Sequence, residues 1–204
     1  AAFRAPTSSN IQSYTVITVR NPETKQRLAV PTGNQQHIID CPVFLAFCAD
    51  LTRLEHVLKE RNHTLGNNNL EIGLVSSIDA SLVGMSAYLA AESLGIKGVM
   101  IGAVRNDAGK IAEILELPKF VFCVFGMCLG YPAEMPQQKP RMKQDFVVHR
   151  EKFQPEKSLR PLRPMILHSA PIMRKSAKRQ HRTPGATTWT KSSIRSCAKA
   201  CAHN

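Results

Sequence analysis

The sequence predicts an α+β fold organised around one buried helix, on three observations. Residues 78–91 carry almost no charge, and Leu82, Met85 and Leu89 recur there at helical spacing. A helix that is apolar on most faces is buried in a core or in an oligomer interface. Short apolar or β-branched runs elsewhere in the chain predict strands.

The central helix is expected to lead into a tight turn and a strand. Gly95 follows the last periodic residues and suits a left-handed helix cap. Residues 99–101 then make a short apolar strand, which ends in the small residues Gly102 and Ala103. Small residues at this point leave room for a flat ligand to approach the backbone.

The other elements are predicted in chain order. Residues 14–19 read YTVITV, a β-branched run typical of a strand. The apolar run at 41–50 predicts a central strand buried on both faces. Residues 51–58 have the helical spacing of a surface helix, and 108–115 form an amphipathic helix. Residues 121–132 predict a second buried strand.

Charge is distributed unevenly along the 204 residues, whose net charge is +12. Residues 158–204 contain ten Lys and Arg and no acid, so residues 1–157 are nearly neutral. The composition predicts one globular domain over 1–157 and a basic, low-complexity tail without stable structure over 158–204. No run of 18 apolar residues is present, and we therefore expect no membrane-spanning helix.

Cysteine usage points to a reducing compartment, and we expect the protein in the cytoplasm. Four of the six cysteines lie in apolar runs, as expected of buried free thiols: Cys41, Cys48, Cys123 and Cys128. Cys197 and Cys201 are spaced for one helix face near His203, but two thiols in a low-complexity tail are the simpler reading. We predict no metal site.

One segment carries a specific resemblance. Residues 90–106, AAESLGIKGVMIGAVRN, resemble the AAESLG-x-GG-x-x-x-GG-x-RN segment of the nitroreductase superfamily. The closest branch is the NADPH-dependent FMN oxidoreductases, which comprise flavin reductases and oxygen-insensitive nitroreductases. The resemblance implies a homodimer with a mostly antiparallel sheet flanked by helices. It also implies FMN at the subunit interface, with the central helix forming much of that interface.

Other segments extend the resemblance and suggest cofactor-binding residues. The family's A-x-SS-x-x-x-Q loop is similar to the polar loop PTSSNIQ, with Ser8, Ser9 and Gln12 as the matching positions, and its TGGQxH segment is similar to TGNQQH at residues 32–37. Its KPRLP segment is similar to QQKPRM at 137–142, where Lys139 and Arg141 would approach the flavin phosphate, because a dianion in a cleft needs positive partners. The residues implied to bind the cofactor are Ser8, Ser9, Gln12, Gln35, His37, Met100, Ile101, Gly102, Ala103, Lys139 and Arg141.

Two differences from the family pattern accompany these matches. The family begins with a helix and an HRSxR motif whose arginines hold the FMN phosphate, and the printed sequence starts after that segment. Residues 158–204 do not resemble the family's C-terminal arm. Their cluster at residues 174–182, rich in Lys and Arg, could bind the 2′-phosphate of NADPH or another polyanion.

The resemblance implies an enzyme that passes electrons from NADPH through FMN to nitroaromatics, quinones or free flavin. In such an enzyme the flavin carries the chemistry and the protein positions it, so we predict no separate catalytic side chain. Two alternatives stay open. The chain could be an inactive remnant of the family, or the basic tail could bind nucleic acid in a salt-dependent manner.

Overall fold

The computed structural model describes residues 2–66, 70–135, 138 and 141–159, and the chain separates into two compact units. The first contains Ala1–Ala133 and the second begins at Glu134. The tail predicted from residue 158 falls almost wholly outside the described residues, so the domain boundary at 157 stays a prediction.

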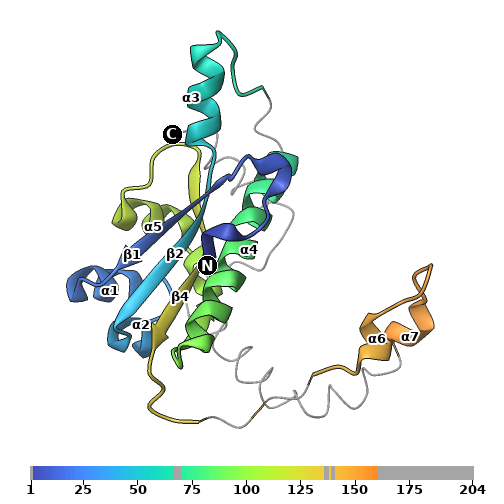
Figure 1. Ribbon diagram of the computed structural model, residues 1–204. Coiled ribbons are helices and arrows are strands. Elements are labelled where there is room, and N and C mark those ends of the chain that lie inside the picture. The colour runs from blue at the N-terminus through green and yellow to red at the C-terminus, as the bar shows by residue number, and fades with distance from the viewer. Residues whose placement is uncertain (1, 67–69, 136–137, 139–140, 160–204) are drawn as a thin grey trace. The chain divides into compact units, whose positions relative to one another are not determined.

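A four-stranded antiparallel sheet forms the centre of the first unit (Figure 1). Its strands are β1 (Tyr14–Val19), β2 (Val43–Asp50), β3 (Lys97–Ile101) and β4 (Val121–Gly130), in the order β1-β2-β4-β3. All three pairings are antiparallel. The two continuous apolar runs form β2 and β4, the two interior strands of this order, as predicted. An interior strand is covered on both faces and both edges, which suits a continuous apolar run.

Helices cover both faces of this sheet (Figure 1). One face packs against α4 (Leu70–Ser93). The other packs against a layer made of α1 (Pro22–Ala29), α2 (Gln36–Asp40), the 3-10 helix η3 (Gly102–Arg105) and α5 (Ala108–Leu115). The helix α3 (Thr52–Glu60) follows β2 directly. Two short 3-10 turns, η1 (Ala2–Arg4) and η2 (Ser8–Asn10), precede β1.

The central helix is longer than predicted, because α4 begins at Leu70 rather than at Ile78. Residues 70–77 contain no proline and continue the apolar spacing, so nothing in them ends the helix. Its C-terminal end agrees with the prediction: Gly95 has φ +78°, and the N–H of Ile96 bonds to the carbonyl of Ala91.

A single glycine lets α4 lie close to the sheet. A Cβ added at Gly84 would stand 2.3 Å from the Cζ atom of Phe125 on β4. The ring of Phe125 stacks on Phe47 of β2 with 4.9 Å between centroids, so it has little room to move away. Phe47, Val83 and Met127 form the buried centre of this layer. The close approach of α4 to the sheet is therefore made at Gly84.

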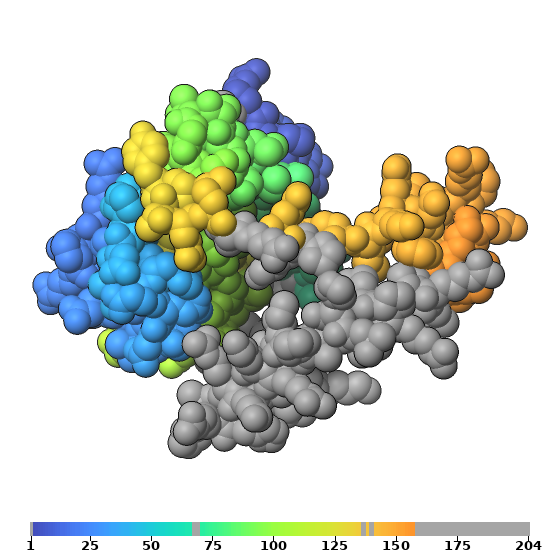
Figure 2. Space-filling view, turned by 90° about the horizontal axis from the view of Figure 1, so that it is seen from below, coloured from blue at the N-terminus to red at the C-terminus, as the bar shows by residue number. Residues whose placement is uncertain are grey.

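The opposite face of α4 is apolar and exposed. Its exposed large side chains, spaced three or four residues apart, form what we call the apolar stripe: Leu70, Leu74, Ile78, Leu82, Met85 and Leu89. Figure 2 shows part of α4 uncovered at the surface of the molecule. Thus one side of the helix is buried in the core, while the other presents apolar groups to solvent.

By length and composition α4 would also suit a membrane span. Two of its polar residues, Ser76 and Asp79, are fully buried on the face toward the rest of the unit, and Asp79 bonds to the segment before β1. Buried polar contacts of this kind are typical of a core helix. A core helix can have the same length and apolar composition as a membrane span.

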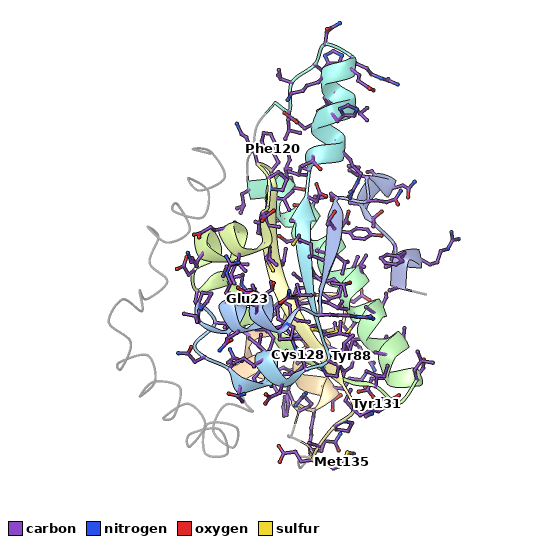
Figure 3. All side chains as sticks on the ribbon, turned by 90° about the vertical axis from the view of Figure 1, so that its left-hand side faces the viewer. Glu23, Tyr88, Phe120, Cys128, Tyr131 and Met135 are labelled. Atoms are coloured by element: carbon purple, nitrogen blue, oxygen red, sulfur yellow. The ribbon has the colours of Figure 1, made fainter. Side chains whose placement is uncertain are left out.

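Four cysteines lie buried as free thiols, as predicted for Cys41, Cys48, Cys123 and Cys128. Cys48 and Cys123 are opposite each other on β2 and β4. Cys128, labelled in Figure 3, lies further along β4 and shares a hydrogen bond with Cys41, which is the largest cause that raises the pKa of Cys128. Burial raises its pKa further, so this thiol is protonated at neutral pH.

The second unit contains two short helices among its described residues, α6 (Gln144–Val147) and α7 (Pro155–Leu159). Between them, the N–H of Gln154 donates to Nδ1 of His149, and the ring of His149 packs on Phe153 at 4.7 Å between centroids. A cavity of about 340 Å³ beside these helices is lined by Gln144, Asp145, Val148, Arg150 and Lys157.

Candidate functional site

The segment before β1, residues 8–13, has an unusual backbone. Ser9, Asn10 and Gln12 adopt positive φ angles of 49°, 54° and 55°. Each left-handed non-glycine residue costs about 1–2 kcal/mol, so such a conformation persists only where surrounding contacts impose it. Residues 8–12 are exposed, whereas Ser13 is buried. We call this segment the N-terminal turn.

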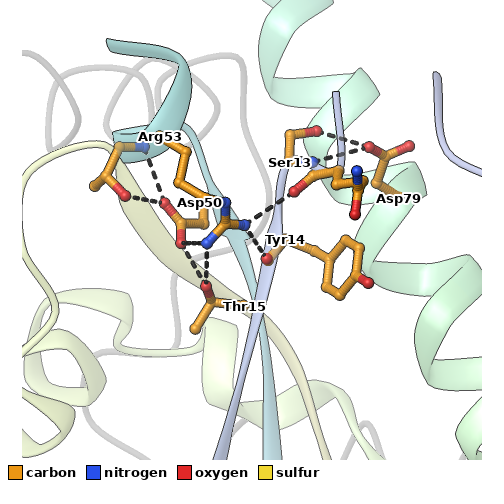
Figure 4. A network of polar contacts seen from close by, with 8 residues as sticks. Ser13, Tyr14, Thr15, Asp50, Arg53 and Asp79 are labelled. Carbon is orange, nitrogen blue, oxygen red and sulfur yellow. Dashed lines mark hydrogen bonds and ion pairs between the residues drawn. The ribbon is translucent and has the colours of Figure 1, made fainter. Parts of the chain in front are cut away.

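A carboxylate on α4 holds both ends of the N-terminal turn, and Figure 4 shows its contact with Ser13. Oδ1 of Asp79 accepts a hydrogen bond from the N–H of Ser8 at 3.0 Å. Oδ2 of Asp79 accepts from the N–H of Ser13 at 3.1 Å and from its hydroxyl at 2.8 Å. Asp79 is 0% exposed, and its two bonds to Ser13 are buried, whereas its bond to Ser8 is partly buried.

A second carboxylate, Asp50 at the end of β2, supports the turn through Arg53 (Figure 4). The Arg53 guanidinium donates to Oδ2 of Asp50 at 3.2 Å, to the carbonyl of Gln12 at 2.9 Å and to the carbonyl of Tyr14. Asp50 also accepts from the hydroxyls of Thr15 and Thr52 and from the Thr52 N–H. The turn is therefore fixed from two directions.

The pKa of Asp50 reflects this network. Burial alone raises the pKa of the carboxyl group, but hydrogen bonds from Thr15 and Thr52 and the charge of Arg53 outweigh burial and lower it. Asp50 is therefore ionised at neutral pH and stays a good acceptor for the groups that support the turn.

The end of β3 presents backbone rather than side chains. Ile101 is buried in the core, so only its backbone could meet a ligand, whereas Met100 is exposed. Gly102 is exposed, and a Cβ there would meet only the flexible end of Arg105, whose Nη2 lies 3.2 Å away. Arg105 also donates to the carbonyl of Val124 at 2.5 Å. An open stretch of backbone with a neighbouring cation thus follows β3.

Gln35 precedes α2 directly, and His37 lies within α2. The chain reaches them through left-handed Gly33 and Asn34, with φ angles of 83° and 54°. Gln35 is half-buried, and its amide nitrogen donates to the carbonyl of Thr32 at 2.8 Å. His37 is exposed in the first turn of α2.

Within one chain the structure does not bring all of these predicted residues together. Tyr14, which follows the N-terminal turn, pairs with Ala49, whereas Val19 pairs with Phe44 near the start of β2. The turn and the segment of Gln35 and His37 therefore lie at opposite ends of the β1–β2 pair. The backbone after β3 belongs to the opposite edge of the sheet. Arg141 is an exposed residue of the second unit, and Lys139 lies outside the described residues.

The sequence predictions missed four charged residues that surround these segments: Asp50, Arg53, Asp79 and Arg105. One signal was present for Asp79, because it is the only carboxylate between residues 72 and 91. An acid in an apolar helix is expected to be buried with partners. No group of three or more His, Cys, Asp or Glu suited to a metal occurs in the part of the chain that the structure describes. Cys197 and Cys201 lie outside it.

Comparison with known proteins matches residues 1–131 to the Nitroreductase family. The "FMN reductase [NAD(P)H]" of Bacillus subtilis is 42% identical over 155 residues, which are 75% of this chain and 62% of that protein. The "Oxygen-insensitive NADPH nitroreductase" of Salmonella typhimurium is 37% identical over 156 residues, which are 76% of this chain and 63% of that protein. This chain thus spans somewhat less than two thirds of the length of both relatives.

A solved structure shows the same architecture. The NADPH:FMN oxidoreductase from Vibrio harveyi complexed with NAD+ superposes with a TM-score of 0.75 and 31% sequence identity, covering 86% of this chain and 78% of that one. The predicted α+β fold with an antiparallel sheet flanked by helices is therefore confirmed.

Proposed function

The chain belongs to the nitroreductase family, and from this premise we propose that it is an FMN-dependent NAD(P)H oxidoreductase. The observation that carries the proposal is the N-terminal turn, whose exposed polar groups are held in a left-handed conformation by buried carboxylates. Backbone that surrounding contacts hold in a strained left-handed conformation is common at ligand sites. The turn coincides with the serines and glutamine that the family resemblance assigns to flavin contacts.

The residues present fit FMN chemically. The isoalloxazine edge carries both acceptors and donors, which the hydroxyls of Ser8 and Ser9 and the amide of Gln12 match. Gly102 is exposed and has no side chain of its own, and the neighbouring group is the flexible end of Arg105, so a flat ring could approach the backbone there. We propose that Lys139 and Arg141 hold the phosphate and that Arg105 supplies a further cation beside Gly102. Gln35 and His37 complete the proposed polar contacts.

We propose that two copies of the chain build each site. The predicted groups are spread over opposite ends of the β1–β2 pair and the far edge of the sheet, so a single copy does not assemble them. The apolar stripe of α4 supplies a surface for the second copy, because exposed apolar side chains in one contiguous row mark interaction sites. A homodimer packed along α4 would cover the stripe and join the separate groups.

The proposed chemistry is the cofactor's, and the protein prepares its surroundings. Bound FMN would supply the hydride-accepting ring and the electron transfer from NADPH to a small acceptor, for which we propose nitroaromatics, quinones or free flavin. The N-terminal turn orients the ring through Ser8, Ser9 and Gln12. Positive charge from Arg105 favours negative charge that develops on the ring during reduction. Asp50 and Asp79 do not meet the ring but hold the turn.

The buried free thiols support a reducing location, and we propose the cytoplasm. Small molecules are the proposed partners besides the second copy. The relatives give no support to nucleic-acid binding, because both are named as flavin or nitro-compound reductases.

The proposal is tested by adding FMN to the purified chain. We expect the flavin to remain bound through gel filtration and the complex to oxidise NADPH in the presence of a quinone or a nitroaromatic compound. Absence of FMN uptake would overturn the proposed activity and leave the fold unaffected.

A further inference from the structure

Asp79 stands out because nothing in the proposed chemistry uses it directly. It is fully buried in the middle of α4, yet its side chain accepts three hydrogen bonds from outside that helix. All three go to Ser8 and Ser13, residues 71 and 66 positions away in the sequence. A buried carboxylate is retained only where its hydrogen bonds offset the loss of water, so these bonds define its surroundings.

The bonds fall at the two ends of the N-terminal turn. Oδ1 holds Ser8 and Oδ2 holds Ser13, and the three left-handed residues lie between these two attachment points. With both ends fixed to one rigid group, the intervening residues have few conformations left to them. The polar groups of Ser9, Asn10 and Gln12 are exposed on the outer side of this arrangement.

Building on the flavin site proposed above, we propose that Asp79 is a positioning residue for FMN. It fixes the N-terminal turn before the cofactor arrives, so that binding does not have to order the turn. Preorganisation of this kind raises affinity because the cost of ordering is met during folding. Asp79 acts through the turn and does not itself contact the flavin.

The substitution Asp79→Asn tests this role. An amide nitrogen cannot accept a hydrogen bond, so either Ser8 or Ser13 loses its acceptor while the side chain keeps its size. The matched control is Ser76→Ala. Ser76 is also fully buried on α4, but its hydroxyl donates only to the carbonyls of Ile72 and Gly73 of the same helix, at 2.9 and 3.2 Å. Ser13→Ala is a milder variant, which removes one of the three bonds.

We expect Asp79→Asn to raise the FMN dissociation constant about tenfold or more, and Ser13→Ala by a smaller factor, in fluorescence titrations. Ser76→Ala should leave it within about twofold of wild type even where thermal stability falls. At saturating FMN, the visible circular dichroism of the flavin should change in Asp79→Asn but not in Ser76→Ala. Equal FMN affinity in folded Asp79→Asn and wild type would overturn the proposal. Equal weakening of FMN binding by Ser76→Ala would also overturn the proposal.

Hydrogen exchange separates this inference from the proposed function. In the FMN-free chain, amides of residues 7–14 should exchange faster in Asp79→Asn than in Ser76→Ala, with β2 unchanged in both. If wild type binds no FMN, the proposed function fails, while faster exchange confined to the turn still supports the positioning of these residues. Unchanged amide exchange in the N-terminal turn of Asp79→Asn would refute the positioning role of Asp79. Should Asp79→Asn fail to fold, Ser13→Ala carries both measurements.

Discussion

Replacing Leu82 by lysine should dissociate the proposed dimer, because Leu82 lies in the middle of the apolar stripe of α4. Association along the stripe would bury apolar surface, because its six side chains are between 39% and 72% exposed in one copy. If a second copy packs against the stripe, the substitution dissociates the dimer. If the stripe faces solvent in the free protein, the substitution leaves the oligomeric state unchanged.

The magnitude follows from the exposed fractions. Complete burial of a leucine-sized side chain is worth about 1.5–3 kcal/mol, so covering the exposed half of each stripe residue in two copies gives roughly 10–15 kcal/mol. Association itself costs about 4–15 kcal/mol. Leu82→Lys removes about 2 kcal/mol of burial and places an ammonium group from each copy in an apolar interface, which costs several more. A total near 5 kcal/mol raises the dimer dissociation constant by about a thousandfold or more.

Sedimentation velocity over a concentration series measures this directly. Wild type should sediment as a dimer at micromolar concentration, and Leu82→Lys as a monomer with the same circular dichroism spectrum. The matched control is Val57→Lys on α3, because Val57 is also an exposed apolar residue, 47% exposed, but lies off α4. It should leave the dimer intact. A wild type that is monomeric throughout, or a Leu82→Lys variant that dimerises as well as wild type, would refute the reasoning.

Three further predictions concern the core, the acid network and the flavin site. Gly84→Ala should be less stable to urea than Gly73→Ala, because overpacking against Phe125 costs about 1–3 kcal/mol, whereas a Cβ at Gly73 meets nothing within 4 Å and gains about 1 kcal/mol of helix propensity. Equal stabilities would show that α4 and the sheet yield freely. Asp50→Asn should lower stability at neutral pH by about 2 kcal/mol, because it removes an acceptor that Thr15, Thr52 and Arg53 share. Since the pKa of Asp50 is lowered in the folded state, its contribution is complete above the unfolded pKa of about 4 and is lost as pH falls through the folded pKa. The difference in melting temperature between Asp50→Asn and wild type should therefore shrink below about pH 4, and a constant difference would contradict the assignment. Gly102→Val should weaken FMN binding about tenfold or more with little change in melting temperature, because it covers exposed backbone without entering the core; unchanged FMN titrations would exclude this backbone from the site.

The strands and the cap at Gly95 could be predicted because their signals are local. Continuous apolar runs mark β2 and β4 as interior strands, and one glycine after the last helical turn marks the end of α4. The start of α4 was misplaced because Gly73 and the polar turn before it obscured a helix whose apolar spacing had already begun at Leu70. Helix boundaries depend on capping contacts that sequence periodicity does not contain.

The contacts that hold the N-terminal turn in place could not be predicted from the sequence, for a different physical reason. The resemblance singled out Ser8, Ser9 and Gln12, but the groups that fix them, Asp79 and Arg53, lie 71 and 41 positions away along the chain. Such contacts exist only after the sheet has brought α4 and β1 together. The lone acid of α4 indicated a buried partner without indicating which one.

Anaerobic addition of NADPH to the FMN-loaded chain tests the central claim most directly. We expect the yellow flavin absorption to bleach at a rate that rises with NADPH concentration and to return when a quinone is added. A chain that binds FMN, yet whose flavin absorption is unaffected by NADPH and by NADH, would contradict the assignment as an oxidoreductase.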